Sequence, residues 1–441
     1  MKKVARKFQE IVSNKELMKK IGFTLLILAL YRLLVFVPVP FVNIDALMSG
    51  AMDSGAAAGF GYLVMLMGGA LSNFAIVAIG VSPYITSSII FQLLGSVIPK
   101  LEELQEQGDV GRAKISQYTR RLTAPLAFVQ GIGMVFIMNQ MLGGNAIDTG
   151  NILVVCWTAF MLTVGSLILM WMGEMITEKG ISNGISLLIF ASIVSGIMQK
   201  AYTSLASGEN VVAIVLFMVL IVLVLTLLSI FILKSQKEIP VIYTKSGKVQ
   251  QSSILPIPLN PVGMVPIIFA MAFVSFPYLM SQLITQFQPA NEKLMAIANW
   301  IQLNLNIYSS NPGRLAIIFY VIFIVGFTFL YTSITFNPER IADSIQKRGG
   351  YVPGIRPGKQ TTNYINKILM HLCLWWGLGL ALIAIYTYVL DAIPFITQIA
   401  SALGGMPTIV AGSGVIIIVG VVQDILNKVE TDLVMAKYEK Y

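Results

Sequence analysis

The sequence has few of the side chains on which metal sites and covalent catalysis depend. Of its 441 residues, two are cysteines, Cys156 and Cys373, and one is a histidine, His371. Both cysteines lie inside apolar runs, so the sequence predicts neither a disulfide framework nor a zinc site. The glycine motifs that bind phosphates and dinucleotides are also missing. We therefore expect no metal, no cofactor and no catalytic residue, and if the chain moves a cargo, the energy would come from a partner.

Charged residues are scarce as well, and long apolar runs take their place. Only 12% of the residues are charged, 56% are hydrophobic, and the mean hydropathy is +0.78. This composition excludes an ordinary soluble domain and is typical of an all-α polytopic membrane protein. Gly80 and Pro83 predict a break inside the longest run. The apolar runs predict ten transmembrane spans, near residues 21–37, 60–97, 122–141, 152–172, 184–200, 211–233, 262–286, 314–336, 368–390 and 408–426.

The placement of the cationic residues predicts the orientation of the chain in the membrane. The N-terminal segment, the loops after spans 2, 4, 6 and 8, and the C-terminal tail hold 26 of the 30 Lys and Arg residues. The positive-inside rule assigns this side, with both termini, to the cytoplasm. The net charge of +9 then reflects orientation, so we expect no direct DNA binding.

An odd number of spans in each half predicts two inverted, pseudo-symmetric halves of five helices. In the N-terminal segment, an interfacial helix would turn Phe8, Ile11, Val12 and Leu17 toward lipid, and a disordered basic tail is the alternative. The expected segments are a cytoplasmic amphipathic segment at 1–20, the N-terminal half at 21–200, span 6 with a hairpin loop at 201–261, spans 7–10 at 262–426 and a cytoplasmic tail at 427–441.

Ionisable residues are nearly absent from the predicted spans. Arg32 lies in span 1, and Asp424 and His371 lie near cytoplasmic ends. Ion-coupled transporters usually carry acidic or basic side chains near the membrane midplane. A path lined by aliphatic and small hydroxyl side chains suits a cargo that must not be held tightly.

The pentapeptide GISNG at 180–184 fits the nucleophile-elbow pattern of hydrolases. That pattern requires a strand, a sharp turn and a helix, with Asp and His partners elsewhere. Because predicted membrane helices flank the pentapeptide, we discount Ser182 as a nucleophile. Ser182 or Asn183 is instead expected to cap span 5.

Two long loops on the cytoplasmic side carry most of the remaining polar sequence. In loop 234–261, alternating apolar residues predict a β-hairpin around Ser246 and Gly247. Loop 337–367 contains GYVPGIRPGKQT, in which two prolines restrict the backbone and hold Arg356 at a defined tip. An Arg side chain binds carboxylates and phosphates bidentately, which suits a protein motor or ribosomal RNA.

Three functions are consistent with this organisation to different degrees. A passive channel for polypeptides needs large, basic docking loops, which the chain has. A small-solute secondary transporter of inverted-repeat design needs only short loops. An intramembrane hydrolase needs a catalytic set, which the sequence does not supply. We therefore favour the channel, with the transporter as the alternative.

Five stretches together resemble the SecY/Sec61-alpha family of protein-conducting channel subunits. The resemblance extends in order over nearly all ten predicted spans. The stretches are GGALSNFAIVAIGVSPYITSSIIFQLL (68–94), GRAKISQYTRRLT (111–123), GEMITEKGISNGISLLIFASIV (173–194), FNPERIADSIQKRGGYVPGIRPGKQT (336–361) and DLVMAKYE (432–439).

The resemblance implies an hourglass channel with an aliphatic pore ring, a plug and a lateral gate to lipid. The plug corresponds to residues 59–72, with Gly68, Gly69, Ala70, Leu71 and Ser72 at its end. The polar gate positions are Thr86, Gln92 and Asn260. The positions that match the ring are Val81, Ile85, Ile185, Ile189, Ile268 and Ile417.

The resemblance also implies partners and a location. Docking would use Arg356 and Lys359 in loop 337–367, and Lys245 and Lys248 in the hairpin. The implied partners are SecE, SecG, the SecA motor, the ribosome through its RNA, membrane lipid and polypeptides that bear a signal sequence. The implied location is the bacterial cytoplasmic membrane.

Overall fold

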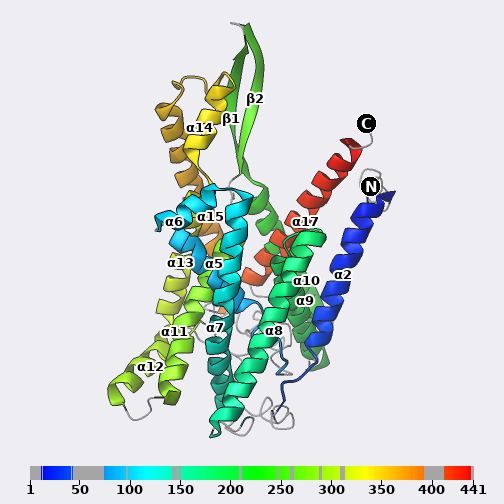
Figure 1. Ribbon diagram of the computed structural model, residues 1–441, viewed down its shortest axis with the longest axis vertical. Coiled ribbons are helices and arrows are strands. Elements are labelled where there is room, and N and C mark those ends of the chain that lie inside the picture. Colours follow the sequence, from blue (N-terminus) through cyan, green and yellow to red (C-terminus); the bar gives the residue numbers. More distant parts are fainter. Residues whose placement is uncertain are drawn as a thin grey trace.

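The computed structural model is a helical bundle from which a β-hairpin projects at one end (Figure 1). It describes residues 11–438 apart from 12, 41, 43–73, 96–97, 142–146, 148–149, 208–210, 246–247, 259–262, 288–290, 308–312 and 392–411. The predicted plug at 59–72 and the gate residue Asn260 therefore lie outside the described residues.

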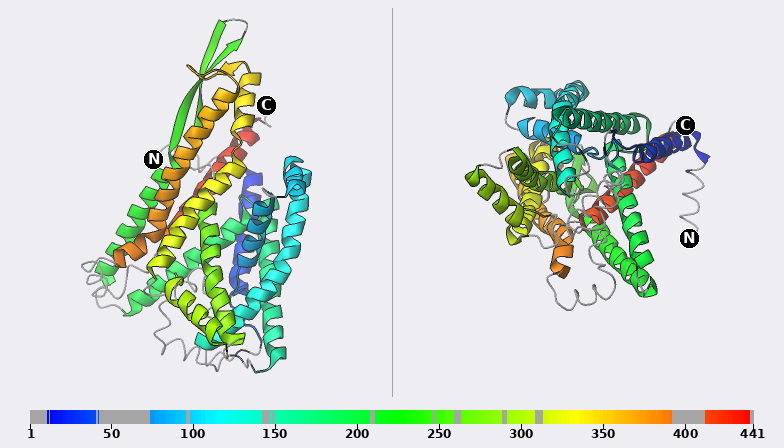
Figure 2. Two further views of the ribbon diagram at one scale, coloured as in Figure 1. Left: turned by 90° about the vertical axis from the view of Figure 1, so that its left-hand side faces the viewer. Right: turned by 90° about the horizontal axis from the view of Figure 1, so that it is seen from below.

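The long helices follow the predicted spans in order. In Figure 1 and in the left view of Figure 2, most of them run along the length of the molecule. Their bounds are α2 Lys15–Leu34, α5 Ser82–Gly95, α7 Asp109–Met141, α8 Ile152–Lys179, α9 Gly184–Ser207, α10 Val211–Lys234, α11 Val265–Phe287, α13 Arg314–Thr335, α15 Lys359–Asp391 and α17 Gly412–Tyr438.

Within the described residues, four helices are long and apolar enough to cross a membrane, or five if a bent pair is one span. The four begin at Ile152, Arg314, Lys359 and Gly412. Three shorter apolar helices correspond to parts of α9, α10 and α11. The mostly helical membrane fold is thus confirmed, whereas ten spans in two inverted halves stay a prediction.

The first span starts earlier than its apolar run. Asn14 accepts hydrogen bonds from the backbone N–H groups of Glu16 and Leu17, which begins α2 at Lys15. The expectation that Leu17 faces lipid is wrong. Its side chain is 2% exposed and packs with Ile181 and Val429, because α17 and the α8–α9 turn cover this face of α2.

The predicted break in span 2 is present. Gly80 has a φ of +66°, a left-handed conformation that side chains with a Cβ rarely adopt. Helix α5 starts two residues later at Ser82, and Pro83 occupies its first turn, where a missing N–H costs no hydrogen bond. The chain therefore changes direction here, and α5 forms a separate half-span.

Several segments that the hydropathy pattern assigned to loops are helical. Helix α15 begins at Lys359, nine residues before predicted span 9, and α7 begins at Asp109. Loop 337–367 is largely ordered as α14, Pro338–Lys347, and the short strand β3, Gly350–Tyr351. These helical segments are polar, so a search for apolar runs does not detect them. Two more short helices are α6, Pro99–Glu106, and α12, Glu292–Asn304.

The predicted hairpin in loop 234–261 is confirmed. Strand β1, Gln236–Lys245, pairs antiparallel with β2, Lys248–Pro258. Strand β3 adds to the other edge of β1, so the sheet has the order β2-β1-β3. The all-α prediction is therefore wrong outside the bundle, where the two long loops form one small sheet. The sheet arises because β1 and β3, which are far apart in the sequence, pair with each other.

Two large apolar clusters form the interior of the bundle. One joins α10, α11, α13, α15 and α17 with Ile89 of α5. The other joins α2, α8 and α9 with Met264 and with Ile417 and Val421 of α17. At the end of the bundle nearest the sheet, Lys20 Nζ and Asp432 Oδ2 form an ion pair of 2.7 Å that links the first and last helices.

Candidate functional site

The six aliphatic residues assigned to the pore ring come together in one cluster. Val81 and Ile417 are buried members of the cluster that joins α2, α8 and α9. Ile85, Ile185, Ile189 and Ile268 are partly buried and pack against it. These residues come from the break in span 2 and from α5, α9, α11 and α17, so segments far apart in the sequence converge here.

We call these six residues, Val81, Ile85, Ile185, Ile189, Ile268 and Ile417, the neck. The position of the neck within the bundle follows from the packing of these residues. Ile85 and Ile268 pack against both large apolar clusters, and so lie where the two cores meet. The backbone N–H of Ile85 donates to the Val81 carbonyl, which places their side chains one turn apart. These two side chains therefore link the two cores of the bundle.

A hydrogen-bonded cap orients the two neck residues on α9. Asn183 Oδ1 accepts from the N–H groups of Ile185 at 3.1 Å and Ser186 at 3.3 Å. Of the two predicted caps, Asn183 is therefore the one used, and GISNG joins two helices without a strand. The cap fixes where α9 begins, and Ile189 follows Ile185 by one turn on the same face.

An open cavity of about 380 Å³ adjoins the neck. Its apolar part is formed by Val265, Phe269 and four neck residues, Ile85, Ile185, Ile189 and Ile268. The rest of the wall is mostly polar, with residues from both halves of the chain. The polar lining residues are Tyr84, Ser88, Gln92, Ser116, Arg120, Glu174, Thr177, Glu178, Asn183, Ser186 and Tyr331.

Two of the residues that line the cavity form an ion pair that was not predicted from the sequence. Arg120 Nε of α7 lies 2.8 Å from Glu174 Oε1 of α8, with side chains 48% and 21% exposed. Predicted span 4 ended at residue 172, which placed Glu174 in a loop, whereas α8 continues to Lys179. The signal that indicates the longer helix is its end: Lys179 lies in the last turn and Gly180 follows as the C-cap.

At the seam expected to form the gate, helices from the two halves of the chain are in contact. Helix α11 packs against both α5 and α7. Thr86 Oγ1 donates to the Ser82 carbonyl and Gln92 Nε2 to Ser88 Oγ, so both gate residues bond within α5. The Oε1 atom of Gln92 is buried and has no partner among the described residues. The contact across this seam is therefore made chiefly by apolar side chains such as Ile89 and Ile267.

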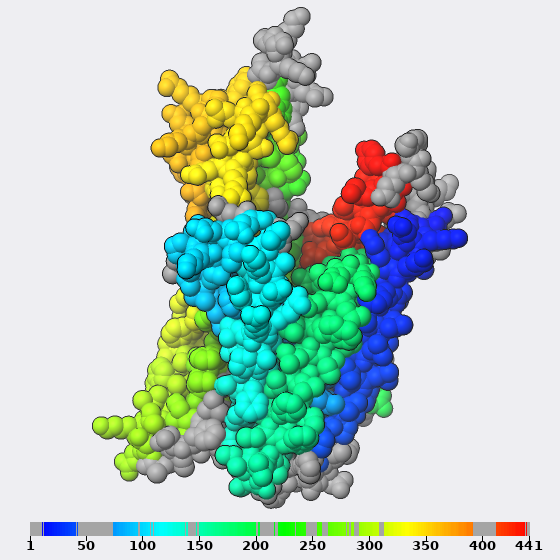
Figure 3. Space-filling model, in the orientation of Figure 1, coloured from blue at the N-terminus to red at the C-terminus, as the bar shows by residue number. Residues whose placement is uncertain are grey.

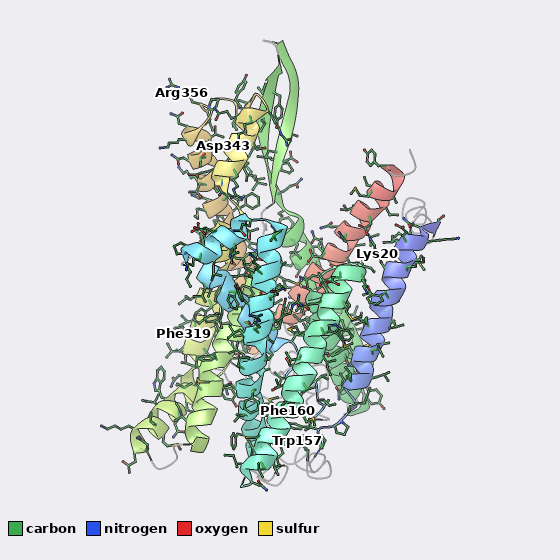
Figure 4. All side chains as sticks on the ribbon, viewed as in Figure 1. Lys20, Trp157, Phe160, Phe319, Asp343 and Arg356 are labelled. Atoms are coloured by element: carbon green, nitrogen blue, oxygen red, sulfur yellow. The ribbon has the colours of Figure 1, made fainter. Side chains whose placement is uncertain are left out.

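The cationic loop forms an exposed tip beyond the bundle, as the space-filling view shows in yellow (Figure 3). Arg356 and Lys359 are exposed, and Figure 4 shows Arg356 at the outer edge of the molecule. The Arg356 carbonyl accepts from Thr361 Oγ1 at 3.0 Å. Gly354, with a φ of +80°, permits the turn between the two prolines.

The hairpin cations are further from the bundle. Lys245 and Lys248 are paired residues at the end of the hairpin, next to its turn. Among the described residues, no group of three or more His, Cys, Asp or Glu side chains is arranged to hold a metal ion.

Comparison with known proteins identifies the family. The SecY family model matches residues 75–426. The protein translocase subunit SecY of Bacillus licheniformis is 37% identical over 441 residues, with 97% of each chain covered. The corresponding subunit of Bacillus subtilis is also 37% identical, with 97% of this chain and 96% of the relative covered.

Solved structures agree at the level of the fold. A structure described as a protein conducting channel superimposes with a TM-score of 0.63 at 19% identity, covering 94% of this chain and 92% of that one. Sec61 in the canine ribosome-channel complex gives 0.60, also at 19% identity, with 94% and 92% covered. With these matches along almost its whole length, the chain belongs to the SecY family of membrane-embedded translocase subunits.

Proposed function

We propose that this chain is a protein-conducting channel, which passes unfolded secretory polypeptides across the membrane and releases apolar segments sideways into lipid. The observation that carries the proposal is the neck: six aliphatic side chains from distant segments converge beside a cavity lined by both polar and apolar side chains. A polypeptide would enter through the cavity and cross the membrane through the neck.

The chemistry of the neck suits a cargo of any sequence. Aliphatic side chains offer no hydrogen bonds, so a passing chain is not held at any one residue. A narrow apolar constriction also loses its water when empty, which blocks ions without a rigid door. In this proposal the plug at 59–72, which includes Gly68 to Ser72, adds a second seal.

The seam between α5 and α7 on one side and α11 and α13 on the other would be the lateral gate. A signal sequence gains roughly 0.3–0.6 kcal/mol for each Leu, Ile, Phe or Val transferred to lipid. Ten such residues supply a few kcal/mol, enough to compete with a handful of polar contacts of about 1 kcal/mol each. Thr86, Gln92 and Asn260 would tune this balance.

The exposed cations would dock the partner that drives transport. Arg356 stands at a tip held by prolines and by the Thr361 hydrogen bond, and Lys359 is exposed three residues later. We infer that Lys245 and Lys248 of the hairpin also take part in docking. We infer that the SecA motor and the ribosome bind here, with SecE and SecG bound elsewhere on the chain. Two fold neighbours are described in complexes with ribosomes, which supports the ribosome as a partner.

The proposed setting is the bacterial cytoplasmic membrane. We infer ten spans in two inverted halves of five, with both termini and the docking loops in the cytoplasm. The support is the charge distribution, since 26 of 30 Lys and Arg residues fall on the predicted cytoplasmic side.

Depletion of the protein in its host tests the function. We expect uncleaved secretory precursors to accumulate in the cytoplasm, detected by pulse labelling and immunoprecipitation. Normal processing of precursors together with failed uptake of a metabolite would favour a small-solute transporter instead.

A further inference from the structure

The hairpin and the Arg356 loop are joined into one unit by direct strand pairing. Ile242 pairs with Tyr351, and Tyr243 with Gly350, which adds β3 to β1. Beneath the sheet, buried residues of β1, β2, α14 and α15 form a separate apolar cluster, against which Tyr243 packs. We call residues 236–258 and 338–369 together the docking unit.

The contact between Tyr243 and Gly350 leaves no room for a side chain at residue 350. A Cβ atom on Gly350 would lie 2.7 Å from Cε1 of the Tyr243 ring and 3.0 Å from Cγ2 of Ile345. Carbon atoms make favourable contact at about 3.5–4.0 Å, so a methyl group could be accommodated only if the ring moved. The ring of Tyr243 therefore lies directly on the backbone of β3.

The backbone between this contact and Arg356 is short and has fixed points. Val352 is 3% exposed within the apolar cluster of the unit. The N–H of Ile355 donates to the Val352 carbonyl at 3.1 Å, which closes a turn. Thr361 Oγ1 donates to the Arg356 carbonyl from the first turn of α15. Arg356 is thus held from two sides, by β3 and by α15.

We propose that Tyr243 is a positioning residue for Arg356, a role that rests on the proposed docking function. The Tyr243 ring holds β3 against the hairpin and so sets the direction in which the tip presents its guanidinium. Bidentate recognition by Arg depends on orientation. A tip that samples several orientations loses affinity, because binding must then restrict it to one.

The charge of the unit fits a polyanionic partner such as ribosomal RNA. Its exposed basic residues are Lys237, Arg340, Lys347, Arg348, Arg356, Lys359 and Lys367, against the exposed acids Glu238, Glu339 and Asp343. A surface with this excess of cations attracts phosphates over a distance, but it does not by itself fix a register. The rigid connection through Tyr243 would supply that register.

The test measures the affinity of ribosomes without a nascent chain for the full-length protein in proteoliposomes. For Tyr243→Ala we expect Kd to rise about tenfold, and for Tyr243→Phe to stay within about twofold, because the hydroxyl group has no hydrogen-bond partner among the described residues. Tyr364→Ala, which removes a 38% exposed ring from α15 of the same unit, is the matched control and should leave Kd unchanged.

A second pair of variants tests the contact itself. Gly350→Ala should raise Kd by a similar factor, since its methyl group displaces the ring. The double variant Tyr243→Ala/Gly350→Ala should be no weaker than Tyr243→Ala alone, because residues in contact are not additive. Additive effects, about a hundredfold in the double variant, would overturn the proposal.

Kinetics separate positioning from a loss of folded protein. In motor-driven translocation, Tyr243→Ala should raise the half-saturating motor concentration and leave the maximal rate within about twofold. A lower maximal rate with an unchanged half-saturating concentration would mean that part of the protein is inactive, and would contradict positioning. If Arg356→Glu weakens ribosome binding and Tyr243→Ala does not, only the positioning role fails. If neither variant weakens it, the docking function fails as well.

Discussion

The proposed seal at the neck depends on aliphatic side chains that have no hydrogen-bonding groups. The side chain of Ile189 cannot donate or accept a hydrogen bond. It packs against the same apolar cluster as the other five neck residues. A seal of this kind depends on volume, because any gap wide enough for water restores ion passage.

Replacing Ile189 by Gly should therefore raise the resting ion leak. The change removes four carbon atoms from the proposed constriction and leaves the other five neck residues unchanged. Ion flux from liposomes that contain the purified protein measures the leak. Ile318→Gly is the matched control, because Ile318 is 53% exposed on α13 and lies outside the neck cluster. An unchanged leak, or an equal leak in the control, would remove Ile189 from the seal.

Arg356 is the residue on which the docking proposal depends most. Arg356→Glu reverses the charge of an exposed side chain, so we expect translocation in inverted vesicles to be abolished while membrane insertion of the protein stays normal. The translocation activity of Arg356→Lys should lie between those of the unchanged protein and Arg356→Glu, since a Lys ammonium keeps the charge but cannot bind bidentately. Normal translocation by Arg356→Glu would contradict the docking role.

Helices α7 and α8 are linked at the cavity wall by the one ion pair described between them. The pair is partly exposed, so it should stabilise the packing only modestly, by about 0.2–1 kcal/mol. Ser87 Oγ of α5 donates to the Thr119 carbonyl at 2.7 Å, one residue before Arg120. Polar contacts thus connect α5, α7 and α8 on the same side of the seam.

A charge exchange tests this connection between elements. Arg120→Glu and Glu174→Arg alone should each lower the thermal midpoint of the purified protein, since each puts like charges side by side. The double exchange should recover most of the loss. If the thermal midpoint of the double variant falls by the sum of the two single-variant decreases, the two side chains do not interact.

At the scale of the whole molecule, the two apolar cores meet at the neck, and the sheet lies beyond one end of the bundle (Figure 2). The start of α2 and the end of α17 lie at that same end and are joined by Lys20 and Asp432. The docking unit includes the first turns of α15, its hairpin precedes α11 in the chain, and both helices belong to the core on one side of the seam.

Single cysteines test the predicted topology of the whole chain. In a background without Cys156, which is exposed, cysteines added at both ends should react with a membrane-impermeant maleimide only in inside-out vesicles. Glu292→Cys, in the exposed first turn of α12, should react only in spheroplasts. Labelling of the two ends from opposite sides would contradict an even number of spans.

The sequence by itself determined the features that depend on neighbouring residues. The helical membrane class, the break at Gly80, the hairpin and the Asn183 cap all follow from local hydropathy, backbone freedom or hydrogen bonding within a few residues. The exposed position of Arg356 follows in the same way from the prolines on either side.

Only the tertiary structure decided which distant residues meet. Periodicity could not separate Ile85 and Ile268 from the many other aliphatic residues of the spans, and the family resemblance selected them. The burial of Leu17, the Arg120–Glu174 pair and the seat of the Tyr243 ring on Gly350 were not predicted at all. Each is a contact between segments far apart in the chain, and its existence depends on how whole helices and strands pack, which no local pattern encodes.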